Sequence, residues 1–124
     1  MKILGLIFSW IVALEHIFIL VLEMFLWESL GLKVFKMTPE LAAQSKTLAM
    51  NQGLYNGFLA AGLIWGLLFI SNKEWKVNVL NFFLSCVIVA GIFGGLTAKF
   101  SIIFTQGTPA LIAILALNLL YKKD

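Results

Sequence analysis

The chain has 124 residues, of which 61% are hydrophobic and 12% are charged, and its formal net charge is +3. A domain of this size cannot hide so much apolar surface from water, which excludes an ordinary soluble protein. The basic residues are all lysines in short connections and tails, which indicates membrane-surface flanks and excludes a phosphate-binding stripe for nucleic acid.

Four apolar segments follow one another along the chain, and each is as long as a membrane-crossing helix. About 20 residues at 1.5 Å per residue cross a hydrocarbon core about 30 Å thick. Three segments carry no ionisable residue except at their ends. The sequence therefore predicts a single all-α membrane domain, residues 1–124, built as a four-transmembrane-helix antiparallel bundle. Its helices are expected at about residues 3–27, 39–70, 77–98 and 102–121.

The first segment contains Glu15, His16 and Glu23, although each such group costs roughly 2.5–3.5 kcal/mol at the centre of a membrane helix. On a helix, His16 and Glu23 lie about 20° apart around the axis and about 10 Å apart along it, with Trp27 on the same side. Glu15 points about 100° away from His16. His16 and Glu23 can therefore line one cavity. No small-residue cleavage site follows, so we expect an uncleaved helix and not a signal peptide.

The long connection over residues 28–47 contains a helix start. Thr38 is a typical N-cap residue, Pro39 suits the first helical position, and Glu40 complements the positive end of the helix dipole. We expect the second helix to begin near Pro39 and to enter the bilayer about two turns later. The preceding residues 30–36 alternate apolar side chains with lysines, which is typical of a segment on the membrane surface.

The second segment opens with the most polar stretch of the four. On a helix, Asn51 and Tyr55 share one face, while Gln52 and Asn56 share the adjoining face. Because the chain reverses direction, this stretch should reach the membrane depth of Glu23, with Tyr55 and Asn56 deeper, towards His16. Buried polar groups in hydrocarbon must bond to one another or to water. The sequence thus predicts a polar pocket in one leaflet, lined by His16, Glu23, Trp27, Asn51, Gln52, Tyr55, Asn56 and Gln106.

Small residues mark the expected contacts between helices. Gly53 and Gly57 lie four residues apart, a spacing that allows close approach of membrane helices. Packing within one bundle explains this spacing better than a homodimer seam, which is the less favoured alternative. In the fourth segment, Pro109 should kink the helix or free a carbonyl near Thr105, unless the helix begins only at Pro109.

The chemistry of the pocket is less defined than its position. The chain has one histidine and one cysteine, Cys86, and its carboxylates lack a ligand spacing, so no metal site is predicted. No nucleophile–base arrangement or cofactor motif is visible, so we predict no cofactor. The catalytic residues are unknown, and whether the protein is an enzyme stays undecided.

Two blocks of the sequence carry a resemblance to a known family. They comprise His16 with residues 23–27, Glu-Met-Phe-Leu-Trp, and residues 51–63, which begin Asn-Gln-Gly-Leu-Tyr-Asn-Gly. The chain resembles the small bacterial integral membrane proteins known as domain of unknown function thirteen-oh-four. The resemblance implies a four-helix membrane protein of one domain with no established activity.

Three functional hypotheses follow. The first is a pocket for a small lipophilic or amphipathic molecule, in which His16 and Glu23 exchange protons and the amides orient a polar group. The second is a small proton-coupled exporter that works as a dimer and uses Glu15 or Glu23. The third is a structural or partner-binding membrane subunit.

The expected location is the cell membrane, inner or plasma, with several crossings and the lipid bilayer as surroundings. Lysines in short loops and tails favour the cytoplasmic side. Both termini are therefore expected in the cytoplasm, because Lys2, Lys73, Lys76, Lys122 and Lys123 slightly outnumber Lys33, Lys36, Lys46 and Lys99.

Overall fold

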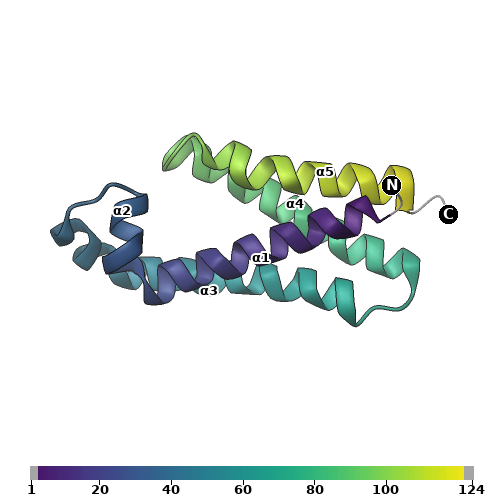
Figure 1. Ribbon diagram of the computed structural model, residues 1–124, viewed down its shortest axis with the longest axis horizontal. Coiled ribbons are helices and arrows are strands. Elements are labelled where there is room, and N and C mark those ends of the chain that lie inside the picture. The colour runs from purple at the N-terminus through teal and green to yellow at the C-terminus, as the bar shows by residue number, and fades with distance from the viewer. Residues whose placement is uncertain (1–2, 122–124) are drawn as a thin grey trace. The chain divides into compact units, whose positions relative to one another are not determined.

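The computed structural model describes residues 3–121, so Lys2, Lys122 and Lys123 of the orientation count lie outside the described residues. No strand occurs among residues 3–121, and the predicted all-α class is confirmed. Three short segments, labelled η, are π-helical. In chain order the elements are α1 (Leu4–Phe25), η1 (Trp27–Gly31), α2 (Leu32–Val34), α3 (Pro39–Leu68), α4 (Lys73–Thr97), η2 (Ile103–Gly107), α5 (Thr108–Ala116) and η3 (Leu117–Tyr121) (Figure 1).

Three helical stretches of residues 3–121 are long and apolar enough to cross a membrane: Leu4–Phe25, Lys73–Thr97 and Ile103–Tyr121. The helix α3 has 30 residues, which exceeds the length that a crossing needs. It is not among the three because its first half carries Lys46 and the polar stretch that starts at Asn51. The structure therefore supports a helical membrane protein, while four crossings and a four-helix bundle stay predictions.

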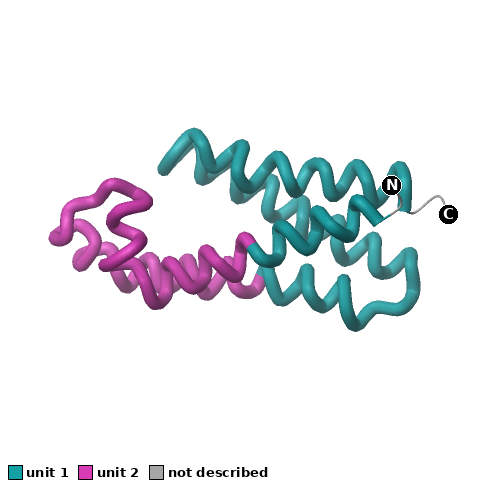
Figure 2. The backbone as a smooth tube through the Cα atoms, in the orientation of Figure 1, with its two compact units in different colours: residues 1–14, 59–124 teal, residues 15–58 magenta. Residues whose placement is uncertain are grey.

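The chain divides into two compact units (Figure 2). Unit 1 contains residues 1–14 and 59–124, and unit 2 contains residues 15–58. Both α1 and α3 contribute residues to each unit. The units differ in how their helices are held, and each is described separately below.

The core of unit 1 is apolar and fully buried. Leu63, Leu80, Leu84 and Leu117 have no exposed side-chain surface, and smaller residues such as Ala110 and Ala113 fill the space between them. Large branched side chains against alanines allow close helix packing where lipid offers no hydrophobic advantage. The apolar segments of the sequence therefore supply the core of this unit.

The start of α1 approaches η3 more closely than any side chain would permit. A Cβ atom at Gly5 would lie 2.7 Å from the backbone nitrogen of Leu117 and 3.0 Å from its Cα. Ser9, one turn further on, is buried and donates a hydrogen bond of 2.7 Å to the Gly5 carbonyl. Glycine at this position is thus required by backbone-to-backbone contact.

A polar pair joins α4 to η3 inside unit 1. Asn81 Nδ2 donates to Asn118 Oδ1, and Asn118 Nδ2 donates back to Asn81 Oδ1, each at 3.0 Å. Asn118 Nδ2 also donates to the Ile114 carbonyl at 2.7 Å. Each side-chain amide therefore donates one hydrogen bond to the other and accepts one from it, and we call this arrangement the closed pair.

The connection between α3 and α4 is capped by side chains. Asn72 accepts a hydrogen bond of 3.0 Å from the Trp75 backbone N–H and begins α4. Lys76 Nζ donates to the Leu67 carbonyl at 3.0 Å, which satisfies one of the free carbonyls at the end of α3. A short link between antiparallel helices is thereby fixed at both of its ends.

The helix changes type just before Pro109, where a kink, a free carbonyl or a helix start was expected. The π-helical segment η2 ends at Gly107, and α5 begins at Thr108 with the proline in its first turn. Proline has no N–H to donate, so the α-helical bonding pattern cannot continue through it unchanged. A π-helical turn just before the proline accommodates that missing donor.

In unit 2, α3 begins at Pro39, as predicted. The Thr38 side-chain oxygen accepts a hydrogen bond of 3.2 Å from the Leu41 backbone N–H, which confirms the N-cap. The helical turn α2 before it ends in a Schellman motif, with Met37 N–H bonded to the Leu32 carbonyl at 2.9 Å. Lys36 takes the left-handed position of this motif, with φ of 53°.

Candidate functional site

The acidic side chain nearest the end of α1 is hydrogen-bonded to an amide of α3. Asn56 Nδ2 donates to Glu23 Oε2 at 3.1 Å and to the Gln52 carbonyl at 3.0 Å. Because both partners are acceptors, the amide nitrogen must face them, and the Asn56 oxygen points elsewhere. Glu23 is half-buried. The bond joins two of the eight residues that the sequence analysis assigned to one pocket.

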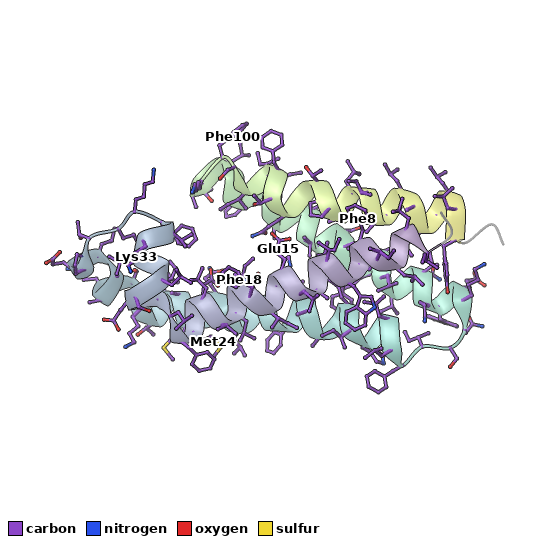
Figure 3. All side chains as sticks on the ribbon, viewed as in Figure 1. Phe8, Glu15, Phe18, Met24, Lys33 and Phe100 are labelled. Carbon is purple, nitrogen blue, oxygen red and sulfur yellow. The ribbon has the colours of Figure 1, made fainter. Side chains whose placement is uncertain are left out.

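Close approach of the two helices makes this bond possible. A Cβ atom at Gly53 would lie 2.7 Å from Met24 Cγ, 3.0 Å from Glu23 Cβ and 3.2 Å from the Leu20 carbonyl oxygen. One turn further, a Cβ atom at Gly57 would overlap the Leu20 side chain. The spacing of small residues on α3 therefore serves contact with α1 within unit 2 (Figure 3, where Met24 is labelled).

The remaining polar residues of α3 lie on other faces. Gln52 precedes Asn56 by one turn, at the side of the contact, and its side chain is exposed. Asn51 and Tyr55 lie on the face of α3 opposite to Gly53, and 61% of Tyr55 is exposed. Within unit 2, Glu23 is thus bonded to Asn56, while Gln52 takes part only through its backbone carbonyl and Asn51 and Tyr55 lie on the opposite face.

His16 lies two turns before Glu23 on the same face of α1, and it is completely buried. The separation along the helix, about 10 Å, keeps the two side chains from touching. Its burial agrees with an imidazole that faces protein. The predicted chamber shared by His16 and Glu23 stays a prediction, as does proton exchange between them.

Trp27 is held at the end of α1 by a partner that the sequence analysis missed. Its Nε1–H donates to Ser45 Oγ at 3.0 Å, and its ring lies 5.4 Å from the ring of Phe35. Ser45 in turn donates to the Leu41 carbonyl at 2.7 Å. A partly buried indole N–H usually finds a hydrogen-bond acceptor, and this tendency is the signal that could have pointed to Ser45.

An ion pair lies next to this tryptophan. Lys46 Nζ is 2.5 Å from Glu28 Oε2, and both side chains are about half exposed. These two residues line a half-open depression of about 180 Å³ together with Met24, Phe25, Trp27 and Ser29. Sequence reasoning counted Lys46 only as a topology signal, because nothing local links it to a residue 18 positions earlier.

Gln106, the last of the predicted pocket residues, belongs to unit 1. It lies in η2, and a Cβ atom added at Gly91 of α4 would lie 3.5 Å from the Cβ of Gln106. The apolar groove of unit 1, about 260 Å³, lies elsewhere, between Leu4, Ile112, Leu115, Ala116, Leu119 and Leu120. Neither this groove nor the depression is lined by Glu23, His16 or the amides, so an enclosed polar pocket stays a prediction.

No group of histidine, cysteine and acidic residues among positions 3–121 is arranged to hold a metal ion. Three long apolar helical stretches, small residues at helix contacts and an acid of α1 bonded to an amide of α3 are the features of a small helical membrane protein.

Comparison with known sequences defines the group further. The chain belongs to the family described as protein of unknown function (DUF1304), whose model matches residues 10–118. It is 37% identical over 119 residues to the uncharacterized protein YpaA of Lactococcus lactis subsp. lactis (strain IL1403). The matched residues cover 94% of this chain and 98% of that protein. No solved structure matches the chain. The family resemblance expected from the sequence is thereby confirmed.

Proposed function

We propose that the protein binds a small amphipathic molecule within the membrane, and that Glu23 and Asn56 hold the polar group of that molecule. The observation that carries this proposal is the hydrogen bond from Asn56 of α3 to Glu23 of α1, a helix that is long and apolar enough to cross a membrane. Ionisable residues in membrane helices are expensive and therefore mark functional positions by default.

The bonding of the pair defines what it would recognise. The bond from Asn56 engages Oε2 of the carboxyl group, and it is the one hydrogen bond that Glu23 makes with residues 3–121. The Asn56 nitrogen is committed to two acceptors, so its oxygen is left as an acceptor too. Two neighbouring acceptors favour a ligand that donates hydrogen bonds, such as an alcohol or an amine on a hydrocarbon skeleton.

Long-chain probes test this directly. We expect 1-dodecanol to raise the melting temperature of the purified full-length protein in detergent, because a ligand that binds the folded state stabilises it. Dodecyl methyl ether has nearly the same chain but no donor, and it should have a much smaller effect. Equal effects of the alcohol and the ether on the wild-type protein would overturn the proposal.

Matched variants locate the effect. Asn56→Leu should reduce the difference between alcohol and ether, since it deletes one of the two acceptors and leaves the carboxyl of Glu23 as the other. Glu15→Gln changes the other acid of α1, which lies about 100° away from His16 and forms no hydrogen bond with residues 3–121. This control should keep the difference.

A partner-binding role is the second candidate, and one observation favours it. Asn51 and Tyr55 lie on the α3 face that points away from α1, and both are exposed. Each polar group left against lipid would cost on the order of several kcal/mol. We therefore expect another polar surface to cover these two side chains. Crosslinking from position 55 in native membranes tests whether a second protein lies there.

A further inference from the structure

The depression beside Trp27 has a polar and an apolar half. Met24 and Phe25 are the last residues of α1, and 71% of Phe25 is exposed. Trp27, Glu28 and Lys46 form the rest of the lining with Ser29. Since α1 is apolar enough to span a bilayer and ends at Phe25, the depression lies where hydrocarbon gives way to lipid head groups.

The charges of the depression come as an adjacent pair of opposite sign. Glu28 and Lys46 are in contact, with side chains 45% and 53% exposed, so each can still reach a second partner. An ammonium group has three donors, and a carboxylate has about four acceptor positions, of which this pair uses few. A half-exposed ion pair contributes little to stability, so opening it to include a ligand costs little.

A ligand that satisfies both charges must itself carry both signs. A phosphate near Lys46 and a primary ammonium near Glu28 would complete a ring of alternating charge with charge-assisted hydrogen bonds. The volume of about 180 Å³ leaves room for a small polar head group. The exposed ring of Phe25 and the partly buried side chains of Trp27 and Met24 suit the glycerol and first methylene groups.

We propose that this depression binds the head group of a phospholipid that carries a primary amine, of the phosphatidylethanolamine class. The site is separate from the Glu23–Asn56 pair, which does not line it, and the inference goes beyond the function proposed above. The amine is the discriminating group, because a trimethylated ammonium keeps the charge but has no N–H to donate to Glu28.

Quenching of tryptophan fluorescence by brominated lipids tests the proposal. The full-length protein is reconstituted in phosphatidylcholine vesicles that contain a minor fraction of a brominated lipid. The contribution of Trp27 is the difference between wild-type and Trp27→Phe protein. We expect brominated phosphatidylethanolamine to be enriched about fivefold over brominated phosphatidylcholine at Trp27, as one additional charge-assisted hydrogen bond would give. Brominated diacylglycerol, without phosphate, should be the weakest of the three.

Two variants separate the two halves of the head group. Glu28→Gln should abolish the preference for ethanolamine over choline while keeping both above diacylglycerol. Lys46→Gln should bring phosphatidylcholine down to the level of diacylglycerol. Glu40→Gln and Lys33→Gln make the same charge changes at exposed positions of unit 2 outside the depression, and they should behave as wild type.

Equal quenching by all three lipids in wild-type protein, within a factor of about two, would overturn the proposal. Free phosphoethanolamine should not compete at millimolar concentration, and full competition would show a soluble ligand in place of a lipid. Glu23→Gln should leave the lipid preference unchanged. The lipid site and the intramembrane pair can therefore fail independently of one another.

Discussion

Units 1 and 2 use polar side chains in opposite ways. In unit 1, Asn81 and Asn118 satisfy one another reciprocally inside a core of leucines and alanines. In unit 2, Asn56 donates to Glu23 in one direction only, and the charges of Glu28 and Lys46 are half exposed. The reciprocal bonds commit the two amides to each other within a packed core, whereas the one-sided bond and the half-exposed charges of unit 2 leave acceptors and donors that a ligand can use.

Gly5→Ala should break unit 1 and produce the largest effect. The new Cβ would meet the backbone of Leu117 at 2.7 Å and 3.0 Å, and a backbone cannot move aside as a flexible side chain can. We expect the free energy of unfolding, measured by denaturant titration in mixed micelles, to fall by about 3 kcal/mol. Gly107→Ala is the control, because nothing lies within 4 Å of its Cβ, and it should be neutral or slightly stabilising.

Asn56→Leu should weaken unit 2 by about 2 kcal/mol, since it leaves a half-buried carboxyl without its donor. Hydrogen exchange followed by mass spectrometry should show faster exchange in residues 39–58 and little change in residues 73–97. Equally faster hydrogen exchange in both units would contradict a difference in how the two units are stabilised. Asn56→Gln keeps the donor group and should exchange more slowly than Asn56→Leu.

Replacing the closed pair of unit 1 sharpens the contrast. Asn81→Leu should cost about 1 kcal/mol of unfolding free energy, because Asn118 loses a partner but keeps its bond to the Ile114 carbonyl. The double variant Asn81→Leu with Asn118→Leu should recover most of the loss, as replacement of both partners is close to neutral. A double variant less stable than either single one would mean that the amides contribute beyond their mutual bond.

Lys36→Gly should produce the smallest change, and in the stabilising direction. Lys36 has φ of 53° at the end of α2, a conformation that glycine adopts without steric penalty. We expect a gain of about 0.5–1 kcal/mol in the local stability of unit 2, seen as slower exchange of the Met37 amide. Lys33→Gly, within α2, should lower that protection.

Much of the helical organisation could be predicted from the chain alone. The apolar segments mark the helices because only intrahelical bonding satisfies the backbone in hydrocarbon. The start of α3 could be predicted at Pro39, since Thr38 provides the cap and the proline needs no donor. The spacing of Gly53 and Gly57 indicated a helix contact, and the opposed directions of the first two helices placed the polar stretch that begins at Asn51 at the level of Glu23, with Asn56 expected deeper.

The tertiary structure decided which side chains meet. Helical periodicity offered four polar residues of α3 as partners for Glu23, and only the rotation of α3 about its axis selects Asn56 and turns Asn51 and Tyr55 away. The contacts of Trp27 with Ser45 and of Glu28 with Lys46 each join residues 18 positions apart across a connection. Local sequence patterns specify the period of a helix but not its rotation or the path of a loop, because these depend on how closely small residues let two backbones approach.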